Sequence, residues 1–483
     1  MEQIITSEPR LKGSLPSDFL WGAASASYQI EGGYDADGKG PSVYDVLWKD
    51  QANGEIACDS YHLWREDIAV LKKYGMKAYR FSINWPRVIT LGGANDPINE
   101  KGLEYYSTLI DALIEADIEP IVTIYHWELP YALYERYQGF YSKKEMLPDF
   151  LRYAELLFER FGARVKNWIT INEPHIITTA ACHLYKGKWN PETDIPRWAE
   201  SMLLCHGATV DLYRRKFQTR QGGKIGITLD IDWTEPIDDS SEARHAHETW
   251  MGHVARLYAD PIFYGRFPDS LMEYYGEHAP SFTEEEWKLV KGSTDFLGLN
   301  HYGTSWVTGE QWTLGEAPRM ESCSGRVKRV FVKDGVVIGN RGNNGHPHDV
   351  PWGFRKLILW LHTNYTKSAQ IPLMVTENGF SVDGEIDLTF EEKIHDVQRQ
   401  HYYAGYIKEM LEAMVDQGVE MSGYFAWSLL DNLEWTSGWV PRFGITVVDR
   451  ENDFARYPKD SAYMLGRIFR YASGQTELSE SSQ

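Results

Sequence analysis

Cysteine and basic residues are both scarce in this chain of 483 residues. It has four cysteines (Cys58, Cys182, Cys205 and Cys323), none in a CxxC pair, which argues against a disulfide framework. We interpret them as reduced, mostly structural thiols, although one disulfide stays open. Lysine and arginine number 49 against 69 aspartate and glutamate, which gives a net charge of −20. Such a surface repels nucleic acid and anionic membranes, so we expect neither as a partner.

Long apolar runs are absent too. None reaches the roughly 20 residues of a membrane-spanning helix, and the N-terminus lacks the basic start and apolar stretch of a secretory leader. We therefore expect a cytoplasmic protein of soluble, globular composition. No repeat and no Pro/Ser-rich linker divides the chain. We predict one domain over residues 16–473, with an N-terminal extension over 1–15 and a polar, mobile tail over 474–483.

Aromatic residues, by contrast, are abundant, with 18 Trp, 29 Tyr and 19 Phe. A large aromatic core would explain them. A pocket for flat-faced neutral ligands such as sugars, whose C–H faces stack on rings, is the second explanation, and on composition alone the aromatic core is favoured over it. Composition alone leaves both interpretations open.

Short β-branched or aromatic runs alternate with amphipathic helical stretches along the chain. Helices are predicted through Trp64, Ile68 and Leu71, ending near Gly75, and within 105–116, 150–161 and 390–416. Eight strands separated by long crossovers are typical of a (β/α)8 TIM barrel with elaborated loops at the C-terminal face of the strands. A doubly wound open sheet is the rival, but no GxGxxG follows a predicted strand. The eight predicted strands are 19–25, 78–85, 120–127, 167–172, 224–230, 295–302, 372–377 and 421–428.

A long stretch over residues 303–352 follows one of these strands. Such excursions usually wall the active site of a barrel. Within it, Asp334-Gly335 between apolar runs predicts a hairpin, and residues 341–347 predict a loop.

Two predicted strands lead into a glutamate at the barrel mouth, Glu173 after Asn172 and Glu377 before Asn378. Two carboxylates facing one another are what glycoside hydrolysis requires, because one donates a proton to the leaving oxygen while the other attacks or activates water. Taken singly, each has a structural explanation. Glu173 could lie at the start of a helix capped by Asn172 with Pro174 in its first turn, and Glu377 could be a solvated turn residue.

Further motifs follow in order along the predicted strands. They are FLWG at 19–22, YQIEG at 28–32, GKGPS at 38–42, YRFSI at 79–83, HWELP at 126–130, TINEP at 170–174, DFLGLNHY at 295–302, VTENG at 375–379, WSL at 427–429 with DN at 431–432, and RFG at 442–444. In this series the chain resembles glycoside hydrolase family 1, the β-glucosidase family, from about Phe19 to Phe469. One motif alone would be weak evidence, whereas the ordered series is specific.

The resemblance implies roles for individual residues. Glu377 matches the nucleophile that forms a covalent glycosyl-enzyme, and Glu173 matches the general acid/base; such retaining chemistry needs the two carboxyl groups ~5–5.5 Å apart. Arg80 and Tyr302 lie on motifs that would place a cation and a hydroxyl beside Glu377 and keep it ionised. Arg80 could otherwise form a buried ion pair that only closes the barrel.

A neutral sugar must be held through several hydroxyls at once. The resemblance implies that the glycone is bound by four polar side chains and framed by aromatic rings, although several of these residues could be ordinary core residues. The predicted substrate-binding residues are Gln29, His126, Trp127, Asn172, Asn300, Tyr302, Trp427, Glu434, Trp435 and Phe443.

Three groups of proteins related to this family have other functions. Phospho-β-glucosidases have Ser where this chain has Glu434, and a carboxylate would repel a 6-phosphate. Myrosinase-like enzymes have Gln at the position of Glu173, and glycan-binding pseudo-enzymes usually lack one of the two carboxylates. The departures from the family pattern surround the barrel mouth and leave the leaving-group preference open. They are Tyr44, Glu128, Tyr131, Asp230, Trp439 and the stretch 175–191.

We therefore expect a retaining β-glucosidase that removes terminal β-glucosyl units from cellobiose, cello-oligosaccharides or aryl and alkyl β-glucosides. The same covalent intermediate could also pass to a sugar, as in transglycosylation. We expect no cofactor and no metal, because His245/His247 and His346/His348 show no metal-ligand pattern and are interpreted as surface residues. The choice among glucose, galactose and fucose, the aglycone and the oligomeric state stay open.

Overall fold

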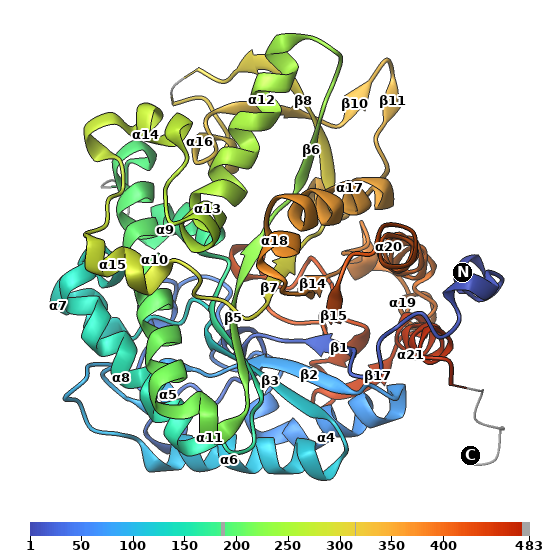
Figure 1. Cartoon of the computed structure of the whole chain (residues 1–483). Coiled ribbons are helices and arrows are strands. Elements are labelled where there is room, and N and C mark those ends of the chain that lie inside the picture. The colour runs from blue at the N-terminus through green and yellow to red at the C-terminus, as the bar shows by residue number, and fades with distance from the viewer. Residues whose placement is uncertain (185–188, 314, 476–483) are drawn as a thin grey trace.

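The centre of the computed structural model, which describes residues 1–184, 189–313 and 315–475, is a closed barrel of eight parallel strands (Figure 1). Strand β1 pairs with both β2 and β15, so the sheet has no edges and the doubly wound alternative is wrong. All eight predicted strands are confirmed, and the (β/α)8 barrel with them. They are β1 (Leu20–Ala24), β2 (Ala78–Ser82), β3 (Glu119–Tyr125), β4 (Asn167–Asn172), β5 (Lys224–Asp230), β7 (Leu297–Asn300), β14 (Leu373–Asn378) and β15 (Met421–Trp427).

Several predicted strands extend beyond the observed ones at the barrel mouth. Strand β3 ends at Tyr125 rather than Trp127, and β2 ends at Ser82. There the backbone turns outward into the loops, and Trp127 has a φ of +82°. Trp127 lines a pocket and Trp85 begins a short helix instead of continuing a strand, a distinction that the apolar pattern does not make.

The helices cover the outside of the barrel. The predicted helices are confirmed in α4 (Ser60–Tyr74), α6 (Glu100–Glu115) and α8 (Lys143–Phe161). Helix α4 ends at Gly75, whose φ of +72° is the left-handed conformation that favours glycine at a helix end.

The single helix predicted over 390–416 is wrong. The structure has two helices there, α19 (Phe390–Ile394) and α20 (Val397–Gln417), separated at Asp396, which has φ −40° and ψ 58°. The Asp396 carboxylate accepts hydrogen bonds from the backbone N–H and hydroxyl of Ser461 at 3.0 and 2.6 Å. This contact with a distant residue fixes the break between the two helices. The helical pattern of residues 390–416 alone therefore does not predict the break.

Helix α10 (Pro191–Tyr213) was not predicted. Most of its side chains are buried, so it has no polar face to produce amphipathic periodicity. Further α-helices are α1 (Gln3–Thr6), α2 (Ser27–Ile30), α3 (Val43–Leu47), α5 (Trp85–Val88), α7 (Tyr131–Tyr137), α9 (Pro174–Leu184), α11 (Thr219–Gln221), α12 (Ser241–Met251), α13 (Leu257–Tyr264), α14 (Asp269–Tyr275), α15 (Glu284–Val290), α16 (Arg319–Ser322), α17 (Pro351–Leu361), α18 (Lys367–Ala369) and α21 (Asp460–Ala472).

The stretch over 303–352 lies beyond the barrel mouth, at the top of Figure 1, where its strand β8 (Thr304–Gln311) forms a small sheet with β9 (Val327–Val330) and with β6 (Trp233–Pro236). The hairpin predicted at Asp334-Gly335 is confirmed, because β10 and β11 pair antiparallel around it. The loop predicted over 341–347 is shorter than expected, since Arg341 pairs with His348. Strands outside the barrel are β6 (Trp233–Pro236), β8 (Thr304–Gln311), β9 (Val327–Val330), β10 (Val332–Lys333), β11 (Val336–Val337), β12 (Asn340–Arg341), β13 (His348–Asp349), β16 (Thr446–Asp449) and β17 (Ala455–Pro458).

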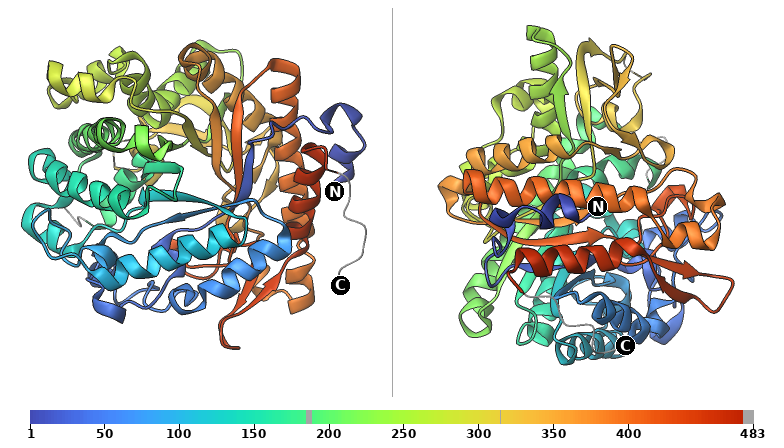
Figure 2. Two further views of the ribbon diagram at one scale, coloured as in Figure 1. Left: turned by 60° about the horizontal axis from the view of Figure 1, so that its bottom comes forward. Right: turned by 90° about the vertical axis from the view of Figure 1, so that its right-hand side faces the viewer.

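The N-terminal segment packs on the outside of the barrel, against α20 and α21 (Figure 2). Ile5 and Leu11 of this segment are buried. The boundaries of the predicted extension and domain stay predictions, and residues 476–483 of the predicted tail lie outside the described residues. Within the described part of the chain, no helix is long and apolar enough to span a bilayer.

Three of the four cysteines have described side chains. Cys58, Cys205 and Cys323 are all buried, and Cys58 and Cys205 form no disulfide. The side chain of Cys182 lies outside the described residues.

A buried charge cluster anchors the loop that follows β15. Lys459 Nζ donates to Glu385 Oε1 at 2.6 Å and to Asp431 Oδ1 at 2.9 Å. Arg399 donates to Glu385 and to the backbone oxygen of Arg442. Burial alone would raise the pKa of Glu385, but Arg399 and Lys459 lower it to about 2. The cluster therefore holds the loop after β15 at two points, Asp431 and the backbone of Arg442, and this loop reaches the barrel mouth.

Substituting Lys459→Met should destabilise the fold strongly. The change leaves the carboxylates of Glu385 and Asp431 short of one partner in a fully buried site, which typically costs about 3–5 kcal/mol. Urea unfolding followed by circular dichroism measures the loss. The matched control is Lys101→Met, which breaks the exposed pair with Asp37 and should leave the stability nearly unchanged. Equal effects of the two substitutions would contradict this role for the cluster.

Candidate active site

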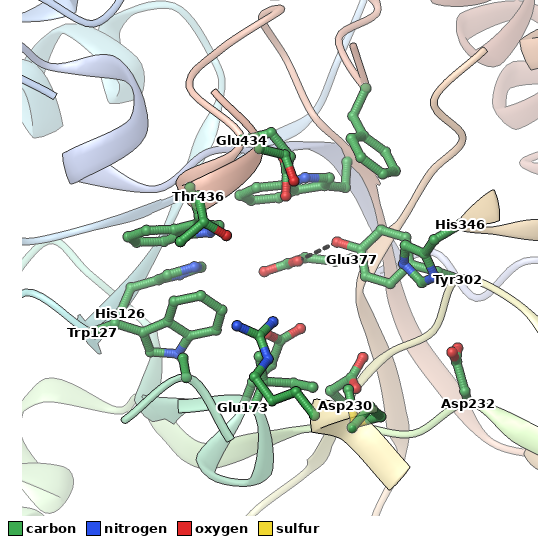
Figure 3. Close-up of a pocket in the computed structure, with 18 of the residues that line it drawn as sticks. His126, Trp127, Glu173, Asp230, Asp232, Tyr302, His346, Glu377, Glu434 and Thr436 are labelled. Atoms are coloured by element: carbon green, nitrogen blue, oxygen red, sulfur yellow. Dashed lines mark hydrogen bonds between the residues drawn. The ribbon is translucent and has the colours of Figure 1, made fainter. Parts of the chain in front are cut away.

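A pocket of about 360 Å³ opens at the C-terminal ends of the barrel strands (Figure 3). Nine of the predicted site residues line it: His126, Trp127, Glu173, Tyr302, Glu377, Trp427, Glu434, Trp435 and Phe443. The other four, Gln29, Arg80, Asn172 and Asn300, are buried and contact residues of the pocket or its loops from behind.

Glu377, near the end of β14, is held by a cation and a hydroxyl. Arg80 Nη1 from β2 donates to Glu377 Oε1 at 2.6 Å. The Tyr302 hydroxyl donates to Glu377 Oε2 at 2.5 Å, the dashed line in Figure 3. Burial raises the pKa of Glu377, while the Arg80 charge and the Tyr302 hydrogen bond oppose the rise. Arg80 therefore does more than close the barrel, because its guanidinium stabilises a carboxylate that faces the pocket.

Glu173 follows β4 directly and has the opposite environment. Its backbone N–H donates to the oxygen of Thr228 at 2.9 Å, and Asn300 Nδ2 donates to its Oε1 at 2.6 Å. Burial, the charge of Glu377 and the charge of Asp230 raise the pKa of Glu173 well above its usual range. No cation of the described residues bonds to it, so Glu173 is the one of the two carboxyl groups whose protonated form is favoured by burial and by neighbouring negative charge.

Asn172 fixes the geometry between these carboxyl groups. Arg80 Nη2 donates to Asn172 Oδ1 at 2.6 Å, so this side chain does not serve as a helix cap, although Pro174 does begin α9. The amide group of Asn172 then faces His126 Nε2 at 3.2 Å. Because an amide nitrogen only donates, His126 Nε2 accepts and its proton lies on Nδ1. Burial and Arg80 lower the pKa of His126 well below its usual value, so the ring is neutral.

The remaining polar groups lie on the loop after β15. Gln29 Nε2 donates to the oxygen of Leu433 at 2.8 Å and supports this loop from below. Glu434 is partly exposed to the pocket. Burial of its carboxyl group and the charge of Glu377 raise its pKa to about 8. It can therefore both donate to and accept from a neutral ligand at pH 7.

Indole and imidazole rings form the walls beside this loop. Trp127 and Trp435 lie with their ring centroids 4.6 Å apart, and His126 stacks against Trp427 at 5.9 Å. Three pocket residues have positive φ without being glycine: Trp127 at +82°, Glu173 at +50° and Trp435 at +45°. Such strain persists only where the surrounding structure imposes it, and it collects at functional sites.

Sequence reasoning missed a group of residues on the outer part of the pocket. Only Arg319, Met320 and Arg329 had a signal for their location, because they lie in the stretch over 303–352 that was predicted to wall the site. The missed lining residues are Trp48, Ile176, Ala180, Asp232, Arg319, Met320, Arg329, Thr436 and Ser437.

The four histidines interpreted as surface residues differ from one another. His245 is exposed, His247 is half-buried against Trp233, and His346 is exposed at the pocket wall. His348 is buried and stacks on Phe331 with centroids 4.1 Å apart, so the surface interpretation is wrong for it. Among the side chains that the structure describes, no group of three or more His, Cys, Asp or Glu is arranged to hold a metal ion.

The departures from the family pattern divide into two groups. Tyr44 and Asp230 line the pocket itself. Glu128 is buried behind it and accepts from the Ser27 hydroxyl at 2.6 Å, while Trp439 stacks beneath the guanidinium of Arg450. Tyr131 begins α7 outside the pocket lining, and residues 185–188 of the stretch 175–191 lie outside the described residues.

Substituting Asp230→Asn should move the basic limb of the kcat/KM profile to lower pH. The acid must be protonated to act, so activity is lost as the pH rises through the pKa of Glu173. Removing the Asp230 charge lowers that pKa, because a neighbouring negative charge disfavours the second carboxylate. Rates across pH with an aryl β-glucoside measure the limb, and exposed Asp239→Asn is the control. A basic limb that stays in place or moves to higher pH would contradict the electrostatic coupling between Asp230 and Glu173.

Comparisons with known proteins agree with this site. Residues 11–472 match Glycosyl hydrolase family 1. Beta-glucosidase 1B of Phanerodontia chrysosporium is 44% identical over 478 residues, which cover 94% of this chain and 85% of that protein. The crystal structure of a GH1 β-glucosidase from the fungus Humicola insolens in complex with glucose has a TM-score of 0.89 at 40% identity, covering 94% of this chain and 98% of that chain. The β-glucosidase from Trichoderma harzianum gives 0.90 at 40% identity, covering 96% and 98%.

The fold and the paired carboxyl groups define a glycoside hydrolase on a TIM barrel. The chain belongs to glycosyl hydrolase family 1. The relatives of this family named above are β-glucosidases.

Proposed function

We propose that the chain is a retaining β-glucosidase that removes terminal β-D-glucosyl units from cello-oligosaccharides and other β-glucosides by double displacement. The observation that carries the proposal is the contrast between its two pocket carboxyl groups. Glu377 is bonded to a guanidinium and a hydroxyl, whereas Glu173 is buried without a cation. A nucleophile must be ionised and an acid must be protonated. These environments therefore favour Glu377 as the nucleophile and Glu173 as the acid.

The first step forms the covalent intermediate. A Glu377 carboxylate oxygen attacks the anomeric carbon, and the bond to the leaving oxygen breaks as Glu173 gives that oxygen its proton. In the second step a water attacks the same carbon, gives its proton to Glu173, and releases Glu377 as a carboxylate. Once Glu377 carries the sugar it is neutral, so the pKa of Glu173 falls and the group can act as a base.

The inner pocket supports a neutral glycone. Glu434 and His126 offer hydrogen bonds, and Trp427 and Trp435 offer ring faces for the C–H surface of a pyranose. The Glu434 carboxyl disfavours a 6-phosphorylated sugar by repulsion whenever it is ionised. These features support a plain glucosyl unit as the group transferred.

The outer pocket supports a hydroxylated aglycone. Trp48, Ile176 and Met320 provide apolar surface, while Asp230 and Arg329 provide an acceptor and a donor. A second sugar presents both a C–H face and hydroxyls, which supports cellobiose and cello-oligosaccharides as substrates. A sugar in this position could also replace water in the second step, which supports transglycosylation.

We also propose a cytoplasmic location. The buried thiols of Cys58 and Cys205 form no disulfide, which suits a reducing compartment. Immunodetection after cell fractionation tests this, and recovery from the medium would overturn it.

Proton NMR during cellobiose hydrolysis tests the proposed function. Retention requires that β-glucose appear first at the newly formed anomeric centre and then mutarotate. Because the leaving glucose of cellobiose is itself an α/β mixture, the anomer is read with an aryl β-glucoside, and first appearance of α-glucose from that substrate would overturn the double displacement. Hydrolysis of aryl β-glucosides without hydrolysis of cellobiose would overturn the cello-oligosaccharide proposal alone. Binding of glucosides without any product would favour a glycan-binding module.

A further inference from the structure

A line of hydrogen bonds runs through the barrel interior and ends on Glu173. The Thr228 hydroxyl on β5 donates to the Thr376 hydroxyl on β14 at 3.1 Å, and Thr376 donates to Asn300 Oδ1 at 2.7 Å. Asn300 Nδ2 then donates to Glu173 Oε1 at 2.6 Å. Thr228, Thr376 and Asn300 are fully buried, so no solvent competes for these bonds. We call these three residues the relay.

The direction of every bond in the relay is fixed by Arg80. A guanidinium can only donate, so the Asn172 atom 2.6 Å from Arg80 Nη2 must be its oxygen. Asn300 lies 3.1 Å from that same oxygen and must turn its NH2 group toward it. Its carbonyl oxygen therefore points at Thr376, whose single hydroxyl proton fills that acceptor. The opposite orientation of the Asn300 amide would set two oxygens against each other.

This orientation decides which oxygen of Glu173 carries the acid proton. Asn300 Nδ2 has no lone pair to accept a proton, so Glu173 Oε1 must be the acceptor of their bond. In a protonated carboxyl group the carbonyl oxygen accepts better than the hydroxyl oxygen. The proton is thereby directed to Oε2, to which no hydrogen bond from a described residue is made.

We propose that the relay is a positioning device for acid catalysis: Thr376 locks the Asn300 amide so that Glu173 presents its proton on Oε2, toward the substrate. This inference rests on the proposed function. In the first step the Oε2 proton passes to the leaving oxygen as the bond to the anomeric carbon breaks and the bond to Glu377 forms. In the second step Oε2 takes a proton from the attacking water. One oxygen thus serves both transfers, while Oε1 stays bonded to Asn300 throughout.

The role predicts a loss that depends on the leaving group. A poor leaving group, such as the glucose of cellobiose, needs a correctly aimed proton, whereas a dinitrophenolate departs without one. A purely structural role for Thr376 would instead lower the rates on both substrates together. Thr376 precedes Glu377 in the chain, and the backbone oxygen of Thr376 accepts a hydrogen bond from Arg80.

The experiment compares Thr376→Val with Thr376→Ser. Valine keeps the shape but removes the hydroxyl, while serine keeps the hydroxyl. We expect Thr376→Val to lower kcat/KM on cellobiose roughly 10- to 100-fold, part of the range for a general acid. On 2,4-dinitrophenyl β-glucoside we expect a change of about twofold or less, and Thr376→Ser should restore most of the cellobiose rate. The rate of inactivation by 2,4-dinitrophenyl 2-deoxy-2-fluoro-β-glucoside should stay unchanged, because it reports on Glu377 without acid assistance.

Two results would overturn the inference. One is an equal loss on both substrates that serine does not restore, and the other is an unchanged cellobiose rate in Thr376→Val. If Thr376→Val does not fold, Thr228→Val removes the first hydroxyl of the relay and is judged by the same two criteria, with a smaller expected loss. Failure of the wild-type protein on both glucosides would instead overturn the proposed function.

Discussion

Substituting Glu377→Gln should lower kcat on every β-glucoside by roughly 10⁴-fold or more, the scale expected when a covalent nucleophile is removed. An amide is a far weaker nucleophile than a carboxylate, and it leaves Arg80 and Tyr302 facing a neutral group in a buried site. Good leaving groups should not rescue the variant, because every substrate needs the covalent step.

Mass spectrometry identifies the nucleophile independently of rates. A 2-deoxy-2-fluoro-β-glucoside with a good leaving group forms the intermediate, and the fluorine slows its hydrolysis. One adduct is expected on the peptide that contains Glu377 in the wild type and none in Glu377→Gln. The exposed Glu391→Gln is the matched control and should label fully. An adduct on another residue would leave the enzyme class intact and overturn the assignment of the nucleophile.

The barrel was predictable because its requirements are local and repeated. Each strand is a short apolar run, and the crossovers show helical periodicity with end signals such as Gly75. Prediction failed where tertiary contacts override local pattern. The break at Asp396 depends on Ser461, more than 60 residues away, and α10 is buried on so many sides that its periodicity vanishes.

The inner site was predictable from motifs, because each motif lies at the end of a barrel strand, where the fold brings distant residues together. The resemblance assigned Asn300 to the substrate, whereas the structure places its amide on Glu173. The partner of Asn300 depends on the direction of hydrogen bonds between side chains of β4, β5, β7 and β14. The spacing of motifs along the sequence does not predict that direction. The outer pocket was less predictable still, because Arg319 begins the short helix α16 and Arg329 lies in the short strand β9, and the sequence around them has no repeating pattern.

Substituting Glu173→Ala should separate the two steps of the reaction. Without a general acid, kcat/KM on cellobiose should fall by roughly 10²- to 10⁴-fold. On 2,4-dinitrophenyl β-glucoside the first step needs no proton and should stay fast. The second step lacks its base and becomes rate-limiting, so a burst of dinitrophenol should precede a slow steady state.

Azide distinguishes Glu173 from Glu377 by the stereochemistry of the product. Azide needs no general base, so in Glu173→Ala it should attack the glycosyl-enzyme from the face that the aglycone left, accelerate turnover and yield β-glucosyl azide. In Glu377→Ala it should occupy the place of the missing carboxylate and attack from the opposite face, which yields α-glucosyl azide from an activated substrate. Proton NMR of the products reads the anomeric configuration directly. The reverse pairing of variants and anomers would exchange the roles of the two carboxyl groups, even though only Glu377 is bonded to a guanidinium.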